Sequence, residues 1–437
     1  MTTPTETGSL ADLEYCIHTC PVIDNHAHNV YKPQWLKTEN LLTTTTEADG
    51  RALEDTPTSL PHLRALKQLR KLYDLPAEAD WPAIVRRRAE LLESDADALT
   101  RKCMEKTQTI LIDDGFDDPD ALQPCQWHDT FTRSSCKRLV RIEELASDIL
   151  SSLYDKKQLP LGSAVANEEA CSVAWATFLE AFETAIAAAL ESPEIAGFKS
   201  AVCFTTGLAI DVPSSDIEAS VSGLHSFRHE FLPDCVAQDF AVEAKGMNDA
   251  LVISTCKLID AAHQQHRLAK PLQFHTGIGN KEIPVLLSNP ACLQPLLTAF
   301  AHVPIILLHA SYPYTRIAGH LATVFKNVYL DVGAVFPEVS RDGQERVLRE
   351  CMELTPWSKL LWSTDGHWFP ETFWLANVQG REAMRTVLME YVEREDLTMQ
   401  EAFRATRAIF FENSNRLYQL GLKMDDPTIQ AQRDFSD

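Results

Sequence analysis

The segment Pro21-Val22-Ile23-Asp24-Asn25-His26-Ala27-His28 places two histidines, one residue apart, directly after an apolar run. Side chains at positions i and i+2 of a β-strand point to the same face. If residues 21–28 form a strand, His26 and His28 therefore direct their imidazole rings together from its carboxyl end. Two convergent imidazoles are half of a typical zinc site. This pattern predicts that further ligands follow other strands of the chain.

Three later apolar runs each end on a residue that can bind a metal. In chain order these residues are His275, His309 and Asp365. Short runs rich in Ile and Leu are typical of parallel strands that are buried on both faces. In a parallel barrel the carboxyl ends of the strands form the face that carries the active site. A single buried histidine is more often a hydrogen-bonded core residue, so the prediction of a metal site depends on the agreement among all these positions.

Eight apolar segments alternate with helical segments along the chain. The expected strands are 21–28, 109–115, 138–143, 198–207, 272–277, 304–310, 327–333 and 359–366. The expected helices include 11–20, 167–190, 248–265, 380–393 and 399–417. Alternation of this kind is typical of a (β/α)8, TIM-type barrel, so the predicted fold class is α/β with a parallel barrel.

Residues 31–106 separate the first expected strand from the second. This stretch is rich in Leu, Arg and Glu, and its apolar residues recur at the helical spacing of about 3.6. We therefore expect a helical insertion, either a lid over the barrel mouth or a packing subdomain with no catalytic role. Residues 1–437 as a whole are expected to form a single barrel domain that includes this insertion and ends in a polar tail after residue 423.

The composition is that of a large globular domain, with 437 residues, 45% of them hydrophobic and 23% charged. The net charge of −22 argues against binding to nucleic acid or to an anionic membrane surface. Eleven cysteines without a CxxC pair indicate a reducing compartment, so we expect a cytoplasmic protein without a thiolate zinc site. With no signal peptide and no stretch of ~18 apolar residues, we expect no membrane-spanning segment. The expected partners are a small-molecule substrate and further copies of the chain in a homo-oligomer, with a dimer preferred.

Several phrases resemble the amidohydrolase superfamily, and more narrowly its amidohydrolase-2 branch. They include DNHAH at 24–28, LLHASYPY at 307–314 and STDGHWFPE at 363–371, and the last two are similar to the amidohydrolase half of FluG-type proteins. The resemblance extends over about residues 12–420. In FluG-type proteins such a domain precedes a glutamine-synthetase-like domain. This chain stops where that domain would begin, so we expect a stand-alone amidohydrolase.

The set of candidate ligands predicts one divalent metal, with Zn²⁺ preferred and Mn²⁺ as the alternative. His26, His28 and His275 offer neutral nitrogens, and Asp365 offers a carboxylate. Asp365 is also the expected general base, because it can reach both the metal and the attacking water. His309 is expected to polarise the substrate carbonyl or to shuttle the proton.

Some members of the superfamily use a carbamylated lysine at the end of strand four to bridge two metals. Lys199 is at the start of the expected strand, so we expect one metal. Relatives of the FluG type would carry an arginine near Thr205, and its absence leaves the substrate open.

Four further residues are candidates for binding a polar substrate. They are Arg141, Glu143, Arg316 and Trp368. Arg141 and Glu143 are expected on one face at the end of strand three, where an arginine could pair with a substrate carboxylate. These residues, and Glu371 three positions after Trp368, could equally form solvated or structural ion pairs.

The predicted function is a metal-dependent hydrolase of a C–N, amide-type bond in a small polar substrate, such as a small polar acid or a γ-glutamyl-like amide. One alternative is a metal-dependent decarboxylase of an aromatic or small carboxylic acid. Its ring pocket would use Phe204, Phe336, Trp362 and Trp368. An alternative of another class is a catalytically silent binding or scaffold protein on the same fold.

Overall fold

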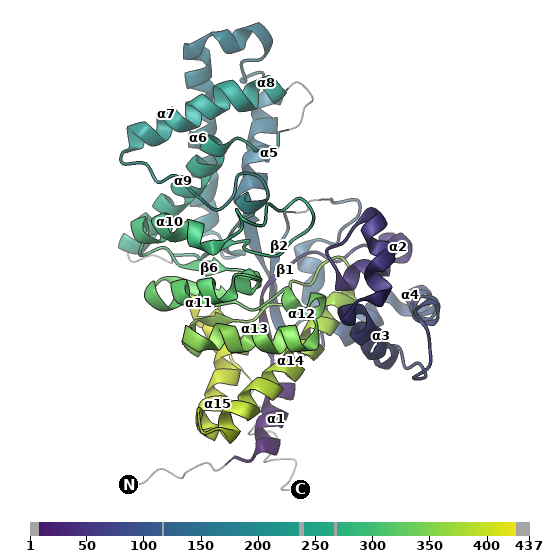
Figure 1. The fold of residues 1–437 in the computed structure, drawn as a ribbon. Coiled ribbons are helices and arrows are strands. Elements are labelled where there is room, and N and C mark those ends of the chain that lie inside the picture. The colour runs from purple at the N-terminus through teal and green to yellow at the C-terminus, as the bar shows by residue number, and fades with distance from the viewer. Residues whose placement is uncertain (1–7, 116–117, 236–239, 266–268, 425–437) are drawn as a thin grey trace. The chain divides into compact units, whose positions relative to one another are not determined.

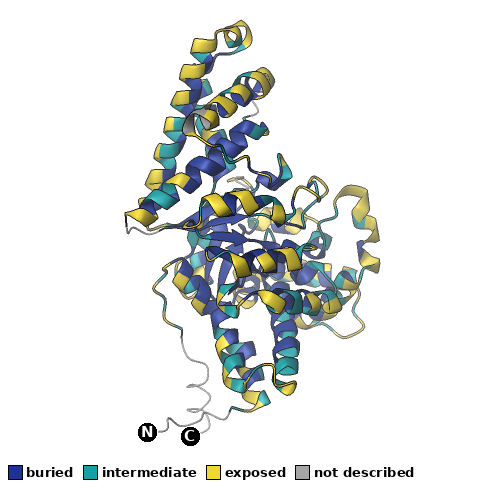
Figure 2. Ribbon diagram, turned by 60° about the vertical axis from the view of Figure 1, so that its left-hand side comes forward, coloured by how far each residue is buried: buried dark blue, intermediate teal, exposed yellow. Residues whose placement is uncertain are grey.

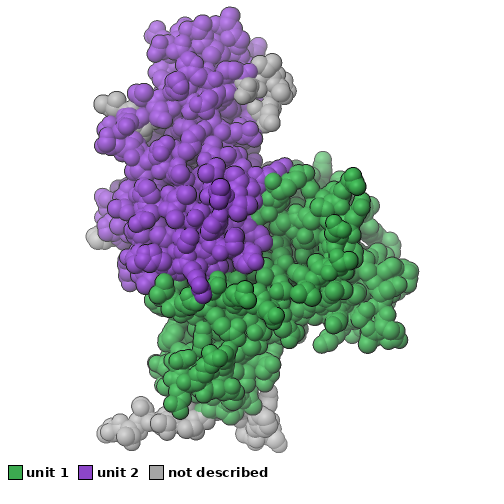
Figure 3. All heavy atoms as spheres, in the orientation of Figure 1, with its two compact units in different colours: residues 1–137, 279–281, 330–437 green, residues 138–278, 282–329 purple. Residues whose placement is uncertain are grey.

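The structure, a computed structural model, describes residues 8–115, 118–235, 240–265 and 269–424. The chain forms two compact units (Figure 3). Unit 1 comprises residues 1–137, 279–281 and 330–437, and unit 2 comprises residues 138–278 and 282–329. Residues 425–437, which include most of the predicted polar tail, lie outside the described residues.

Eight strands follow one another in a single sheet whose order is that of the chain (Figure 1). They are β1 Val22–Ala27, β2 Thr107–Asp113, β3 Lys137–Arg141, β4 Ile195–Ser200, β5 Leu272–Phe274, β6 Ile305–Leu307, β7 Val328–Asp331 and β8 Leu360–Leu361. Strand pairs β1–β2 and β7–β8 in unit 1, and β3–β4, β4–β5 and β5–β6 in unit 2, are all parallel. The predicted (β/α)8 barrel is thereby confirmed.

Backbone hydrogen bonds also join β1 to the segment that follows β8, within unit 1. The amide of Asn25 donates to the oxygen of Trp362, and the amide of His28 donates to the oxygen of Gly366. Every residue of β1 is buried, as expected for a strand that has neighbours on both sides. The HxH segment is therefore held between the carboxyl ends of β8 and β2.

Helices surround the strands in both units. Those of unit 1 are α1 Leu10–Thr19, α2 Pro33–Thr38, α3 Leu60–Leu72, α4 Trp81–Cys103, α12 Val335–Glu338, α13 Arg341–Leu354, α14 Pro370–Glu393, α15 Met399–Arg407 and α16 Asn413–Leu417. Those of unit 2 are α5 Ile142–Asp155, α6 Glu168–Glu191, α7 Asp216–Ser226, α8 Leu232–Asp234, α9 Lys245–Gln264, α10 Gln294–Ala299 and α11 Thr315–Val324. Helix α14 begins ten residues before the predicted start at Gly380. Glycine is required inside this helix because a Cβ there would lie 1.9 Å from the ring of Trp362.

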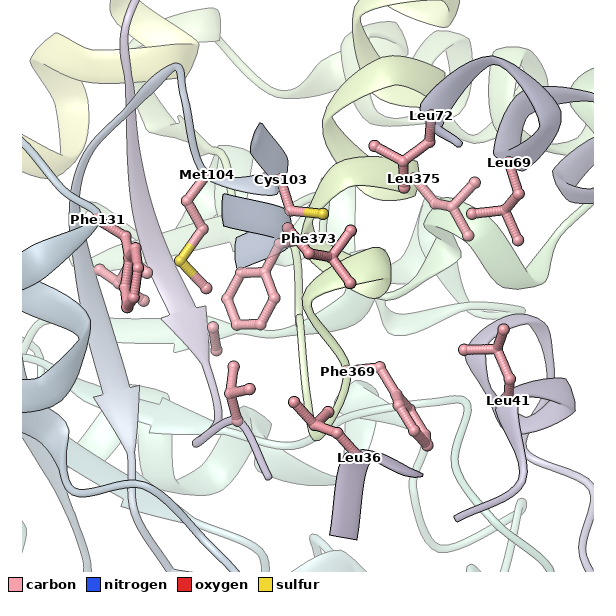
Figure 4. Close-up of a cluster of buried hydrophobic side chains, with 14 of the residues drawn as sticks. Leu36, Leu41, Leu69, Leu72, Cys103, Met104, Phe131, Phe369, Phe373 and Leu375 are labelled. Carbon is pink, nitrogen blue, oxygen red and sulfur yellow. The ribbon is translucent and has the colours of Figure 1, made fainter. Parts of the chain in front are cut away.

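The insertion after β1 is helical and packs against the rest of unit 1. Helices α2, α3 and α4 and the 3₁₀ helices Leu41–Thr45 and Gly50–Thr58 make up most of it. One buried apolar cluster joins the insertion to the first turns of α14 (Figure 4). It contains Leu36, Leu41, Leu69 and Leu72 of the insertion and Phe369, Phe373 and Leu375 at the start of α14. The buried carboxylate of Glu371 accepts hydrogen bonds from Arg88 and Tyr73. For Glu371 the structural ion pair is therefore the correct interpretation.

Helix α6 is the only helix in the described part of the chain that is long and apolar enough to cross a membrane, by length and composition alone. The sequence analysis expected no such segment. Its buried residues include Trp175, Phe178, Phe182 and Ile186, which recur at the spacing of one helical face. Like other long helices of the protein, it has both buried and exposed faces (Figure 2). One face of α6 packs against the rest of unit 2, and this packing accounts for the apolar composition of the helix.

Two strand boundaries differ from the prediction, and the difference changes the positions of Glu143 and Lys199 relative to the strands. Strand β3 ends at Arg141, and Glu143 lies in the first turn of α5 instead of on the strand. Strand β4 begins at Ile195, so Lys199 is its next-to-last residue, and the expectation that Lys199 starts the strand was wrong. The stretch before Phe198 resembles a loop because it contains Pro and Gly, but its parallel pairing with β3 makes it a strand.

Candidate metal site

Unit 1 brings three candidate ligands together at the carboxyl end of β1. Nε2 of His26 lies 3.3 Å from Oδ1 of Asp365, and Nε2 of His28 lies 3.6 Å from the same oxygen. The two imidazole rings are edge-to-face, with centroids 5.0 Å apart. Both histidines are buried, whereas the Asp365 side chain keeps 15% of its surface exposed. Oδ1 of Asp365, the oxygen that faces both histidines, is itself buried.

Two distances between donor atoms of this cluster suit ligands of one zinc ion. Ligands of Zn²⁺ lie about 2.0–2.1 Å from the metal, and tetrahedral geometry places any two of them about 3.3 Å apart. The two nitrogen-to-oxygen distances in this site are 3.3 and 3.6 Å. His26 and His28 also form a group with Asp113 in which the donor atoms all lie within 4.8 Å of one another.

Asp113, at the carboxyl end of β2, orients the ring of His28. Its backbone oxygen lies 2.8 Å from Nδ1 of His28, and its Oδ2 lies 3.9 Å away. A carbonyl oxygen only accepts hydrogen bonds, so Nδ1 carries the hydrogen and the lone pair is on Nε2, which faces Asp365. The sequence analysis did not select Asp113. Its position at the end of an apolar run, like those of the other candidates, was the available signal.

The backbone of β1 also fixes the residue that carries the carboxylate. The amide of Asp365 donates to the oxygen of His26, 3.1 Å away. Asp365 has a φ of +50°, a left-handed conformation that is unfavourable for residues other than glycine. Such a conformation persists only where the surroundings hold it.

Unit 2 brings the other two predicted histidines into direct contact. Nε2 of His309 lies 3.0 Å from Nδ1 of His275. Nε2 of His275 lies 2.7 Å from the backbone oxygen of Ile278, so it carries the hydrogen and Nδ1 has the lone pair. The ring of Phe204 packs edge-on against His275, with centroids 4.6 Å apart. His275 directly follows β5, and His309 lies two residues after the end of β6.

The predicted substrate-binding residues lie in different environments. Arg141 is half-buried at the end of β3, and Glu143 accepts a 2.6 Å hydrogen bond from Ser200. Burial raises the pKa of the Glu143 carboxyl. Arg316 is exposed in the first turn of α11. Trp368 stacks on Tyr31, with ring centroids 5.8 Å apart.

Two of the aromatic residues considered for a ring pocket belong to the core. Trp362 and Phe336 are fully buried and pack against each other with centroids 5.5 Å apart. Trp362 also contacts Phe410 edge-on. Of the four aromatic candidates, Phe204 and Trp368 retain partial exposure.

The insertion reaches the surroundings of Asp365. Glu47, between two 3₁₀ helices of the insertion, is hydrogen-bonded to Glu338 of α12. Burial raises the pKa of Glu338 well above its usual value, and the charges of Glu47 and Asp365 add to this effect. Asp49 forms a 2.7 Å ion pair with Lys281. Residues 47–49 therefore link the insertion to Lys281 and to Glu338, and Glu338 lies close enough to Asp365 for their charges to interact.

Comparison with known proteins supports the predicted similarity to amidohydrolases. The amidohydrolase family model Amidohydro_2 matches residues 266–420. Protein FluG of Emericella nidulans is 43% identical over 419 residues, which cover 94% of this chain and 47% of FluG. The chain thus spans about half the length of the curated relative that it matches.

Solved structures show the same fold. A proposed metal-dependent hydrolase from Lactobacillus casei has a TM-score of 0.75 at 24% identity, over 94% of this chain and 98% of its own. A uronate isomerase from Bacillus halodurans has a TM-score of 0.62 at 13% identity, over 97% of this chain and 98% of its own. Together, these matches show that residues 266–420 belong to the amidohydrolase family whose model they match and that the chain resembles FluG over the part of FluG that it covers.

Proposed function

We propose that the protein is a metal-dependent hydrolase that cleaves a C–N, amide-type bond in a small polar substrate. The observation that carries this proposal is the spacing of the unit 1 donors, with Nε2 of His26 and His28 lying 3.3 and 3.6 Å from Oδ1 of Asp365. These distances agree with neighbouring ligands of one zinc ion. The similarity to amidohydrolases supports the same chemistry.

A divalent metal, Zn²⁺ or Mn²⁺, would act as a Lewis acid that activates water and polarises the substrate carbonyl. In this proposal, side chains of the protein bind the metal ion and transfer the proton of the attacking water. His26 and His28 present neutral Nε2 atoms, and the tautomer of His28 is set by Asp113. Asp365 accepts the proton of the attacking water and passes it to the leaving amine, as a general base and then a general acid.

The parallel order of the strands is the reason for including the histidines of unit 2 in the proposal. The carboxyl ends of the strands of such a barrel share one face, and His275 and His309 follow β5 and β6. In this proposal His275 completes the ligand set, and its Nδ1 exchanges the hydrogen bond with Nε2 of His309 for the metal. His309, in contact with His275, polarises the carbonyl or relays the proton.

We propose one metal ion because the unit 1 donors fit one ion. The position of Lys199 near the carboxyl end of β4, where it is buried, removes the argument that it lies too far away to bridge a second ion. Metal analysis therefore decides the stoichiometry. One tight equivalent per chain supports the proposal, and two would bring Lys199 into the site.

The substrate that we propose is a small polar acid or a γ-glutamyl-like amide. Arg141 is the candidate that would bind its carboxylate, by a bidentate contact, and Glu143, Arg316 and Trp368 remain candidates for the other polar contacts. The neighbouring Glu47–Glu338 pair favours a group that donates hydrogen bonds on the side of Asp365, such as the leaving amine. In this view residues 47–49 are the part of the insertion that closes over the substrate.

Decarboxylation of an aromatic or small acid is the second candidate function. The edge-on contact of Phe204 with His275 favours it, since this ring could stack on a planar substrate. The burial of Trp362 and Phe336 reduces the aromatic surface that such a pocket would need. A catalytically silent scaffold is the third possibility, and metal binding alone would not exclude it.

The test is an assay of metal-depleted protein before and after one equivalent of Zn²⁺ or Mn²⁺ is added. A panel of small amides and γ-glutamyl compounds reports amine release, and a panel of aromatic acids reports CO₂ release. We expect amine release that requires the metal and disappears in His26→Ala. The matched control is His320→Ala, which removes an exposed histidine of α11 and should leave turnover unchanged. CO₂ release without amine release would select the decarboxylase, and no turnover with tight metal binding would favour the scaffold.

A further inference from the structure

A buried carboxylate at the start of the HxH segment contacts the turn that carries Asp365. Oδ1 of Asp24 accepts a 2.8 Å hydrogen bond from the backbone amide of Thr364, and Oδ2 is hydrogen-bonded to the hydroxyl of Thr364. Both residues are almost completely buried. The hydroxyl oxygen of Thr364 also accepts from the amide of Gly366, 2.9 Å away. Asp24 therefore fixes the residues on both sides of Asp365.

A second buried carboxylate holds the residue before Thr364. Oδ1 of Asp331, the last residue of β7, accepts a 3.0 Å hydrogen bond from the hydroxyl of Ser363. Oδ2 of Asp331 accepts a 2.7 Å hydrogen bond from the side-chain amide of Asn25. A Cβ at Gly333 would lie only 1.9 Å from the hydroxyl oxygen of Ser363, so a glycine is needed for this contact.

These contacts hold the backbone of Asp365 in a conformation that is unfavourable without them. Asp365 has a φ of +50°, a left-handed conformation that is unfavourable for a residue other than glycine. Burial of two carboxylates also has a large desolvation cost. A fold that needed only stability could place apolar residues there, so the arrangement is better explained by the geometry that it imposes on the Asp365 carboxylate.

We propose that Asp24, acting through Thr364, is a positioning residue of the metal site. It sets the distance from the Asp365 carboxylate to Nε2 of His26 and His28 and thereby pre-forms the site for the ion. This inference rests on the proposed function only in requiring that these residues bind a metal. It assigns Asp24 no contact with the ion or the substrate.

The test measures metal binding, independently of turnover. Zn²⁺ affinity is determined by competition with a chelating dye, and the visible spectrum of the Co²⁺-substituted protein reports the coordination geometry. Thr364→Val keeps the shape of the side chain and removes the hydroxyl, and we expect its Zn²⁺ affinity to fall 10–100-fold, the usual effect of losing a hydrogen-bond partner of a ligand. Its Co²⁺ spectrum should change as well. Thr364→Ser restores the hydroxyl and should restore affinity and spectrum. If Thr364→Val does not fold, Asp24→Ala, which removes both contacts with Thr364, carries the same expected loss.

The matched control is Asn413→Ala, which removes a buried anchor at the opposite end of β8. The side-chain amide of Asn413 donates to the backbone oxygens of Trp357 and Leu360, 2.7 and 2.8 Å away. This variant should have a lower melting temperature than the parent and unchanged Zn²⁺ affinity. Parent-like affinity and Co²⁺ spectrum in folded Thr364→Val or Asp24→Ala would overturn the inference. A parent that binds no metal would overturn both proposals, whereas metal binding that depends on Thr364 without any hydrolysis would overturn the proposed function alone.

Discussion

The backbone oxygen of Asp113 lies 2.8 Å from Nδ1 of His28. This contact predicts that His28 of the metal-free protein carries its hydrogen on Nδ1, because a carbonyl oxygen only accepts. Long-range ¹H–¹⁵N correlation spectra of labelled protein distinguish the two tautomers, and His28→Gln identifies the signals. We expect Nδ1–H for His28 at neutral pH. An Nε2–H tautomer would mean that the nitrogen facing Asp365 has no lone pair for a metal.

The second prediction separates a metal ligand from a proton-transfer residue in unit 2. His309→Asn should keep the metal and lose much of the turnover, because His309 contacts His275 and is assigned to the substrate or the proton. The loss should be about 10²–10⁴-fold, the usual scale of general acid–base catalysis. Metal content and turnover are measured on the same preparation, beside His320→Ala. Loss of the metal along with activity would instead make His309 a ligand.

The third prediction concerns the ion pair that attaches the insertion to α14. Glu371→Gln leaves the buried guanidinium of Arg88 without its counter-charge. Removal of one partner from a buried pair costs about 3–5 kcal/mol, which urea unfolding should detect. The matched control is Arg87→Ala, which breaks an exposed pair with Glu90 and should change stability by less than about 1 kcal/mol. Equal stability of the two variants would show that the insertion is attached by its apolar cluster alone.

The fourth prediction is a pH dependence of stability. Burial lowers the pKa of His128 to about 4, and its Nε2 accepts from the amide of Val30. The unfolded chain, with a pKa of about 6.5, gains a proton before the folded protein does. The contribution of His128 is therefore complete above about pH 6.5 and is lost as the pH falls toward 4.

Urea unfolding of the parent and of His128→Gln tests this dependence, because the other titrating groups are common to both. Between pH 7.5 and pH 5 the parent should lose about 2 kcal/mol more unfolding free energy than the variant. Parallel pH profiles for the two proteins would show that His128 is not kept neutral by the fold.

The sequence predicted the barrel because its signal is local and repeated. Most strands lie in short apolar runs, and each candidate ligand ends such a run, so an error of one or two residues in a boundary left the order of strands intact. Lys199 and Glu143 show the limit of this reasoning. Pairing between β3 and β4 decided their positions, and pairing between neighbouring strands is not visible in the composition of either one.

The roles of Asp24 and Asp113 could not be predicted from the sequence for a related reason. Asp24 was part of the opening motif and Asp113 ended an apolar run, yet neither had a residue type or spacing that indicated its partner. Their partners, Thr364 and His28, are 340 and 85 residues away along the chain. Only the folded chain brings these groups within hydrogen-bond distance.

Asp365→Asn tests the central claim most directly. The amide keeps the shape of the side chain and can still approach a metal, but it cannot accept the proton of the attacking water. Metal content and turnover are measured on one preparation of this variant, beside the parent and His26→Ala. The account predicts that Asp365→Asn keeps most of the metal and loses about 10²–10⁴-fold in turnover, while His26→Ala loses metal and activity together. Turnover in Asp365→Asn equal to that of the parent would contradict the assignment of Asp365 and the hydrolytic mechanism built on it.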